Sequence, residues 1–511
     1  MRRSLCKPLV AAALSLSFFL PVPVFASVQK DGVHITILHT NDIHARVKDG
    51  DERENSMGMG WIAGAIRAQK DRDADTLALD AGDTFHGLPI INISKGAGMA
   101  QLMNLAGYDA MTPGNHDFNY GAERLHELAG MLNFPMLSAN LVDREGKGYV
   151  FRPYQSYVLD GVKVAVIGLT TPEVAYKTNP ANVQAVKILD PVATAQKWVP
   201  ELRKTHDVVI GLMHMGVDES SEVTSERIAK EVPGFDVIID GHSHTQLDKG
   251  LMVGQTLICQ TGAHGHYLGE VELVVKDHQL RKAQAELLDK SAVQKLAGQQ
   301  DAGVQAALKG IEVSNKAEFQ KVVATSPRVL SCERGLVRAH EAELGDLTAD
   351  AIRWGAQADI GIVNGGGIRA NLPKGKVTKA NLMEMFPFGN TLKKLEVSGS
   401  LLHEVLEHSV EFLPYPFGGF LQVSGVTFTV DPTAKAGSRV TDIKVGNAPL
   451  VPDKKYTLAV NDFTAVGGDN YTMLKSAKVV GEYGTLEEIF ADYLNQHGTR
   501  PASTGRITIK K

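Results

Sequence analysis

The sequence contains few cysteines. Its 511 residues include three cysteines, and Cys6 lies in an N-terminal segment that we expect to be removed, which leaves Cys259 and Cys332. Two cysteines in a chain of this length do not form a disulfide framework, and whether they pair with each other stays open. The composition, 43% hydrophobic and 22% charged, is that of a globular protein with room for two or three domains.

Long apolar runs are also missing after the first 26 residues. No later stretch approaches the roughly 18 apolar residues of a transmembrane helix, so we expect no stable membrane insertion. The first 26 residues differ, because basic residues precede the apolar stretch Leu9–Leu20 and small residues stand at Val24 and Ala26. We interpret residues 1–26 as a cleavable signal peptide, which predicts a periplasmic or secreted protein.

The chain has no excess of basic residues. Its formal net charge is −5, and removing residues 1–26 takes away three positive charges and no negative ones, which gives −8. A mildly acidic protein does not attract nucleic acid or anionic membranes through its field alone. We therefore expect neither nucleic acid nor a membrane as a partner, and no obligatory protein partner is evident.

Short β-rich runs alternate with helical segments between Val33 and about Gln300. The expected strands are Val33–His39, Thr76–Leu79, Val162–Gly168, Val208–Met213, Val237–Ile239 and Thr256–Cys259, and expected helices include Met99–Ala106, Ala122–Leu132 and Ser225–Glu231. The strands are apolar through most of their length, as strands buried on both faces are. This alternation predicts a layered α/β domain.

Seven residues of the types that bind metals follow these runs in a fixed order. They are Asp42, His44, Asp83, Asn115, His214, His242 and His244. In α/β sheets, sites form beyond the carboxyl ends of strands, where most of these residues stand. Carboxylate, amide and imidazole donors together are the mixture that a two-metal hydrolase uses. His34, His126, His206, His264 and His266 are expected to be surface or packing residues, and His86 is also expected to have a structural role.

A second domain is expected after a polar helical segment. We place a linker at residues 302–325, between an N-terminal domain at 27–301 and a C-terminal domain at 326–511. In the latter, Leu347–Trp354 is expected to be a helix and Ile360–Val363 a strand that leads into Asn364 and three glycines. By itself, this glycine run fits a phosphate-binding loop and an ordinary loop equally well.

The C-terminal half also carries residues suited to a nucleotide. Aromatic faces can sandwich a base, guanidinium groups suit phosphate oxygens, and a carboxylate accepts from ribose hydroxyls. The candidates are Arg334, Arg338, Asn364, Arg369, Phe388, Asn390, Phe463 and Asp469. The alternative for the two phenylalanines is that they are core residues.

These motifs resemble the calcineurin-like metallophosphoesterases and, among them, the secreted 5'-nucleotidase family, over nearly the whole chain after residue 26. The resemblance implies an α/β fold: a layered α/β/β/α sandwich, a helical linker and a smaller α/β nucleotide-binding domain. It also implies two divalent metal ions (Zn, Mn, Co or Mg). Asp42, His44, Asp83 and His244 would hold one ion, and Asp83, Asn115, His214 and His242 the other, so that Asp83 bridges.

The resemblance implies roles in substrate binding. Phe388 and Phe463 would stack the base, Asn364 or Asn390 would contact its edge, Asp469 would hold the ribose, and the three arginines would face the phosphates. His116 would protonate or stabilise the leaving oxygen. Many family members carry an Asp where this chain has Asn119. Asn119 can accept a hydrogen bond and orient the ring but supplies no charge, so we expect a lower imidazolium pKa than with Asp.

The expected function is release of phosphate from nucleoside 5'-monophosphates by in-line attack of metal-bound hydroxide, with di- and triphosphates and UDP-sugars as further candidate substrates. One alternative is a 2',3'-cyclic-nucleotide 2'-phosphodiesterase with 3'-nucleotidase activity, because relatives of that kind carry Asn at this place. Another is a nucleotide-binding protein without catalysis, which the seven filled ligand positions disfavour.

Overall fold

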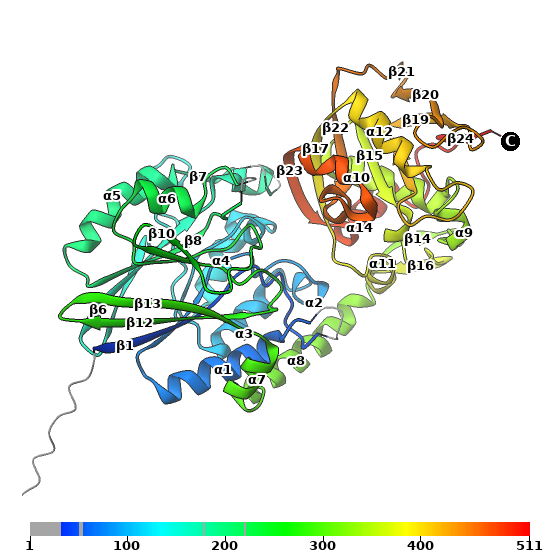
Figure 1. The fold of residues 1–511 in the computed structure, drawn as a ribbon. Helices are drawn as coiled ribbons and strands as arrows, with labels where there is room; N and C mark the ends of the chain where they lie inside the picture. The colour runs from blue at the N-terminus through cyan, green and yellow to red at the C-terminus, as the bar shows by residue number, and fades with distance from the viewer. Residues whose placement is uncertain (1–31, 51–54, 176, 179, 219–220, 511) are drawn as a thin grey trace, which may run out of the picture.

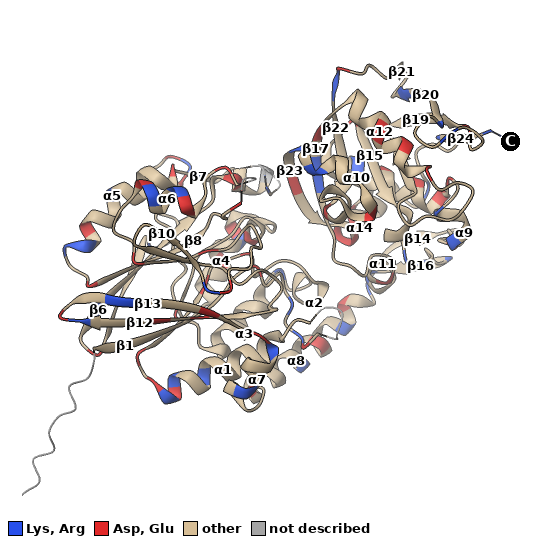
Figure 2. Cartoon of the chain, viewed as in Figure 1, with Lys and Arg blue, Asp and Glu red and all other residues tan. Residues whose placement is uncertain are grey.

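The computed structural model describes residues 32–510 except 51–54, 176, 179 and 219–220, so the expected signal peptide lies outside the described residues. Figure 1 shows two bodies, with the long helix α8 (Ala302–Phe319) running along the N-terminal one toward the other. Among the described residues, no helix combines the length and apolar character needed to cross a membrane. Figure 2 shows Lys and Arg interspersed with Asp and Glu in both bodies.

Two mixed sheets form the N-terminal domain. The first has the order β13-β12-β1-β2-β3, with bounds Gln279–Leu288, Leu268–Lys276, Val33–Thr40, Thr76–Asp80 and Ala110–Met111. The second has the order β10-β11-β9-β8-β6-β5, with bounds Leu251–Val253, Thr256–Cys259, Val237–Ile239, Val208–His214, Val162–Thr170 and Tyr154–Leu159. In each sheet the central strands are parallel, so their carboxyl ends meet at one edge.

Apolar side chains of both sheets meet in a shared core, which includes Ile37, Leu79, Val166 and Ile210. Helices cover the outer faces: α1 (Gly58–Arg72), α3 (Ala97–Ala106) and α4 (Ala122–Met131) lie over the first sheet, and α5 (Pro191–Arg203) and α6 (Ser225–Glu231) over the second. Further elements include α2 (Pro89–Asn92), α7 (Lys290–Ala297) and the ribbon of β4 (Leu141–Asp143) and β7 (Val186–Ile188). The expected α/β/β/α sandwich is confirmed, and so are its predicted strands and helices.

The C-terminal domain is a smaller α/β unit. Its main sheet has the order β18-β15-β22-β17-β23, with bounds Leu421–Ser424, Ile360–Asn364, Lys455–Asn461, Thr391–Ser398 and Lys478–Thr485. Helices α10 (Glu343–Ala356), α11 (Lys379–Met385) and α14 (Leu486–His497) share one core, and α12 (Gly399–Ser409) shares another with a second sheet. That sheet has the order β21-β20-β19-β24, with bounds Ala448–Pro449, Val440–Val445, Val426–Val430 and Ile507–Ile509.

The segment between the domains is ordered on both sides. The carboxylate of Asp301 caps α8 by accepting from the amide of Val304, and the buried Leu308 and Ile311 pack into the core beneath α1 and α3. The following strand β14 (Val322–Ser326) pairs with β16 (Gly375–Thr378) of the C-terminal domain. Residues 302–325 therefore consist of a helix fixed to one domain and most of a strand that belongs to the other.

The two cysteines are not bonded to each other. Cys259 is buried on β11 in the core between the sheets, and Cys332 is partly exposed in the C-terminal domain. Burial raises the pKa of the Cys259 thiol to about 12, which makes it unreactive. The question that the sequence leaves open is thus answered in favour of two separate thiols.

Candidate metal and nucleotide sites

The seven ligand candidates lie at the edge where the carboxyl ends of the parallel strands of both sheets meet. Asp42 and His44 follow β1, Asp83 follows β2, Asn115 follows β3, His214 ends β8, and His242 and His244 follow β9. Six of them form two groups: Asp42, His44 and His244, and Asp83, His214 and His242. Within each group the ligand atoms lie within 4.8 Å of one another.

Direct contacts tie each group together. In the first group, the Nε2 atoms of His44 and His244 are 3.1 Å apart, and His244 Nε2 lies 3.3 Å from Asp42 Oδ1. In the second, His214 Nε2 lies 3.3 Å from Asp83 Oδ2. The same Asp83 oxygen is 4.0 Å from His44 Nε2, so this carboxylate stands between the groups.

Asn115 joins the second group through His242. The Oδ1 atom of Asn115 lies 2.9 Å from Nδ1 of His242. The other ring nitrogen of His242 contacts Glu173, which Lys177 also contacts at 2.9 Å. Burial would raise the pKa of Glu173, but His242 and Lys177 lower it to about 2. A charged carboxylate behind a histidine ligand fixes the ring and raises its basicity. The sequence gives no sign of this pair, because Glu173 follows β6 in an unrelated loop.

The donors fit divalent cations. His214 Nδ1 lies 2.6 Å from the Ala81 carbonyl oxygen, to which it donates, whereas its buried Nε2 has no hydrogen-bond partner in the described part of the chain. Burial lowers the pKa of His214, but Asp83 and Asp42 raise it to about 10. The carboxylates thus attract positive charge to the nitrogen that would bind a metal. Imidazole donors suit transition metals, and carboxylate and amide oxygens suit harder cations such as Mg²⁺ and Mn²⁺.

The backbone at the ligands is strained. Five of them have positive φ: Asp42 (50°), His44 (45°), Asp83 (56°), His242 (80°) and His244 (53°). Residues other than glycine rarely adopt this conformation, and its cost is tolerated mainly where function requires a particular side-chain direction. The chain therefore turns sharply after β1, β2 and β9, which brings these five ligands into the shared centre.

His116 lies beside the metal groups and is held by Asn119. The Nδ2 atom of Asn119 lies 3.1 Å from His116 Nδ1 and 3.0 Å from His86 Nδ1, while its Oδ1 accepts from the Thr178 hydroxyl at 2.8 Å. We expected Asn119 to accept a hydrogen bond from the ring, but it donates, because its amide nitrogen faces Nδ1 while its oxygen faces Thr178. His86, expected to have only a structural role, shares this amide with the catalytic candidate.

The C-terminal domain presents two carboxylates to these histidines. Glu482 on β23 lies 3.4 Å from His116 Nε2 and pairs with Lys393 at 2.7 Å, and Glu488 on α14 lies 3.3 Å from His86 Nε2. Burial would raise the pKa of Glu482, but Lys393 and His116 hold it well below its usual range. In this structure, β23 and the start of α14 thus face His116 and His86.

The nucleotide candidates gather elsewhere in the C-terminal domain. Asn364 donates to Asp469 at 2.8 Å, and the guanidinium of Arg369 lies over the Phe388 ring at 5.8 Å. Burial lowers the pKa of Arg338, and the charges of Arg369 and Arg334 lower it further, which shows that the three arginines lie close together.

The two phenylalanines are not core residues. Phe388 is 53% exposed and Phe463 44% exposed, so both rings are available for stacking. Phe463 follows Asp462, which accepts from Asn390 at 2.6 Å, at the start of α13 (Asp462–Ala465). Arg334 begins α9 (Arg334–Val337). Contacts thus connect several of the expected substrate residues in the C-terminal domain: Asn364 with Asp469, Arg369 with Phe388, and Asn390 with Asp462 beside Phe463.

The chain is similar to known nucleotidases along most of its length. Residues 35–246 match the calcineurin-like phosphoesterase family, and residues 322–476 match the 5'-nucleotidase C-terminal domain. The chain is 31% identical to the snake venom 5'-nucleotidase of Gloydius brevicauda, over 94% of this chain and 90% of that protein. It is also 31% identical to the trifunctional nucleotide phosphoesterase protein YfkN of Bacillus subtilis (strain 168), over 94% of this chain but 35% of that longer protein.

A solved structure shows the same two-domain fold. The 5'-nucleotidase precursor from Thermus thermophilus is 32% identical, with 93% of this chain and 99% of that chain covered and a TM-score of 0.56. Together with the metal-binding groups at the strand ends, these similarities show that the chain belongs to the 5'-nucleotidase family of metal-dependent phosphoesterases.

Proposed function

We propose that this protein is a periplasmic two-metal hydrolase that releases phosphate from nucleoside 5'-monophosphates. The observation that carries the proposal is the position of Asp83 between two groups of ligand atoms, next to His116. Two divalent cations there would activate water and neutralise charge on the phosphoryl oxygens. Asp42, His44, Asp83 and His244 would hold one cation, and Asp83, Asn115, His214 and His242 the other.

His116 is suited to act as the general acid. Because Asn119 donates to Nδ1, the neutral ring carries its proton on Nε2. Nε2 is also the atom that faces the C-terminal domain, from which the nucleotide would arrive. Its proton would pass to the leaving oxygen of the nucleoside, and Asp83 Oδ1 keeps the residue in place by accepting from its amide at 2.7 Å.

Nucleotide recognition would belong to the C-terminal domain. Phe388 and Phe463 would stack the base, Asn364 or Asn390 would contact its edge, Asp469 would hold the ribose, and Arg334, Arg338 and Arg369 would face the phosphates. In this structure Glu482 stands at His116 instead of a substrate. Turnover would therefore require the C-terminal domain to move, as the resemblance implies.

The test is phosphate release by purified, metal-loaded protein from AMP, 3'-AMP and 2',3'-cyclic AMP, each with and without chelator. The proposal predicts fast, chelator-sensitive turnover of AMP. Asp83→Ala should abolish hydrolysis while nucleotide binding to the C-terminal domain survives. Equal hydrolysis by this variant would contradict the metal assignment, and binding without hydrolysis in the wild type would identify a binding protein.

The 2',3'-cyclic phosphodiesterase with 3'-nucleotidase activity is the second candidate. It is favoured by Asn119 itself and by the similarity to a protein named as a trifunctional nucleotide phosphoesterase. Preference for cyclic AMP and 3'-AMP over AMP in the same assay would select this candidate. Turnover of ADP, ATP or a UDP-sugar would extend the substrate range of the first candidate, the 5'-nucleotidase.

A further inference from the structure

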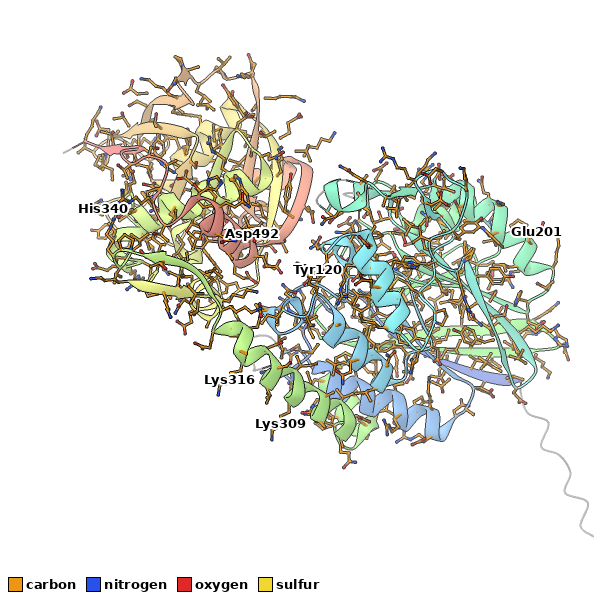
Figure 3. The ribbon with its side chains drawn as sticks, turned by 180° about the vertical axis from the view of Figure 1, so that it is seen from behind. Tyr120, Glu201, Lys309, Lys316, His340 and Asp492 are labelled. Atoms are coloured by element: carbon orange, nitrogen blue, oxygen red, sulfur yellow. The ribbon has the colours of Figure 1, made fainter. Side chains whose placement is uncertain are left out.

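Asp117 is a fully buried carboxylate in the segment that carries Asn115 and His116. It lies in the 3₁₀ turn η1 (His116–Phe118), and no step of the proposed reaction uses it. Figure 3 shows Tyr120, three residues further on, on the side of the N-terminal body that is turned toward Asp492 of the other body. Asp117 therefore belongs to a segment that borders both the metal groups and the C-terminal domain.

The Asp117 carboxylate accepts four backbone hydrogen bonds from two ligand loops. Its Oδ1 atom accepts from the amides of Thr84 and Phe85, both at 2.9 Å. Its Oδ2 atom accepts from the amide of Asp83 at 2.9 Å and from that of Gly114 at 2.8 Å. The side chain thus joins the loop after β2, which supplies the bridging candidate, to its own loop after β3.

A second contact runs between the same two loops in the opposite sense. The amide of His116 donates to Asp83 Oδ1 at 2.7 Å, while the amide of Asp83 donates to Asp117. Each loop therefore offers a carboxylate to the backbone of the other, as the two side chains of a capping box do at a helix N-terminus. Because one bond fixes the Asp83 amide and the other fixes its side chain, this residue has little freedom to turn.

The turn that Asp117 holds also carries the third ligand loop. The carbonyl oxygen of Gly82 accepts from the amide of Asp42 at 2.9 Å, and that of Asp83 accepts from the amide of His44 at 3.0 Å. Asp83 has a φ of 56°, and such strained backbone persists only where its surroundings fix it. Three consecutive amides that begin at Asp83 converge on Asp117, so a shift of this carboxylate would reach ligands of both metal groups.

A carboxylate suits this position better than a neutral side chain. Burial and the negative charge of Asp83 raise the pKa of Asp117, and the backbone hydrogen bonds counteract this rise. An asparagine would avoid the repulsion, but it has one oxygen, and its NH₂ group would face two backbone donors. Only the carboxylate offers acceptors to all four amides, and leaving buried amides unpaired is costly.

We propose that Asp117 is a positioning residue of the metal centre, whose carboxylate fixes the bridging Asp83 relative to Asn115. This inference rests on the proposed function, because it requires two metal ions held by these residues. Asp117 would act through the backbone of the ligand loops and would not itself touch metal or substrate. Loss of one of its oxygens would release the turn at Asp83 from the turn at Asn115, and both ions would then be bound less tightly.

The test is metal binding by Asp117→Asn. Metal-free protein would be titrated with Co²⁺ by calorimetry, and the visible absorption of the Co²⁺-loaded protein would report the ligand geometry. The wild type should bind two ions. In the variant we expect an affinity lower by about 10- to 100-fold, as for other changes that reorient a ligand, and shifted absorption bands. Urea unfolding of the metal-free proteins, measured in parallel, separates this effect from a loss of stability.

Two further variants sharpen the result. Asp117→Glu restores the charge and both oxygens and should recover part of the lost affinity. Asp346→Asn is the matched control, because it changes an equally buried aspartate that lies 3.6 Å from Arg506 in the C-terminal domain. It should lower the free energy of unfolding but keep the metal affinity and the spectrum of the wild type.

Three outcomes would overturn the inference. These are wild-type Co²⁺ affinity and spectrum in Asp117→Asn, an equal loss of affinity in Asp346→Asn, and failure of both Asp117 variants to fold without metal, since Asp117 would then serve the fold itself. A wild type that binds fewer than two ions would instead contradict the two-metal centre, and the inference with it. The wild-type titration therefore distinguishes failure of the proposed function from failure of the role of Asp117.

Discussion

Gly114 makes room for the carboxylate that stands between the two metal groups. A Cβ atom at this position would lie 2.3 Å from Asp83 Oδ1 and 2.7 Å from His214 Cε1, whereas ordinary contacts begin at 3.4 Å. Gly114→Ala therefore has to displace Asp83 by about 1 Å, several times the roughly 0.2 Å that metal–ligand distances tolerate. Asp83 cannot turn away freely, because it is 2% exposed and its amide donates to Asp117.

The expected result is a metal affinity lower by about 10- to 100-fold, as for other changes that reorient a ligand, with a fall of similar size in kcat/KM at limiting metal. Overpacking should also cost about 1–3 kcal/mol of stability. Calorimetric metal titration and phosphate release would measure both. Gly130→Ala on α4 is the matched control, because its Cβ meets nothing within 4 Å. Wild-type metal affinity in Gly114→Ala, or an equal loss in the control, would refute the reasoning.

Three further predictions concern His116, the core and the residues proposed to bind the nucleotide. Asn119→Asp should raise the pKa of the histidine and move the pH–rate profile upward; an unchanged profile would contradict this role. Burial lowers the pKa of His39 to about 3, whereas in the unfolded chain its pKa is about 6.5. The folded state holds the ring neutral, so stability is highest above about pH 6.5 and is lost as the pH falls and the unfolded chain takes up the proton. The free energy of unfolding should fall by about 2 kcal/mol between about pH 8 and pH 5. Urea unfolding should show that His39→Leu lacks this loss and that the exposed His34→Leu on the same strand keeps it. Phe463→Ala should raise the KM for AMP about tenfold at unchanged metal affinity, whereas the exposed Tyr149→Ala should not; equal KM values in the two variants would exclude stacking.

The ends of the buried strands could be predicted because their apolar runs are continuous. β9 and β11 have the bounds expected from the sequence, and β8 extends one residue further, to His214. A polar residue directly after such a run has to lie at the sheet edge, so the ligands could be located without any long-range information. The positive φ values at five ligands could not be predicted, because Asp and His adopt a left-handed backbone more often than most residues but still uncommonly.

Contacts between distant segments could also not be predicted from the sequence. Glu173 supports His242 across 69 positions, and Glu482 reaches His116 from the other domain. Neither carboxylate belongs to a motif, and each becomes recognisable only when its loop or strand is placed against the metal edge. The arrangement of the two domains decides whether His116 meets Glu482 or a substrate, and no local pattern encodes that arrangement.

Asn119 shows how one contact changes the meaning of a residue. Compared with an aspartate, an asparagine looks like the same acceptor without its charge. Once Thr178 donates to Oδ1, however, the amide has two hydrogens left, and the Nδ1 atoms of His116 and His86 receive them. An aspartate could serve both rings only if each carried its proton on Nδ1. Asn119 therefore directs both Nε2 protons toward the C-terminal domain, where Glu482 and Glu488 lie.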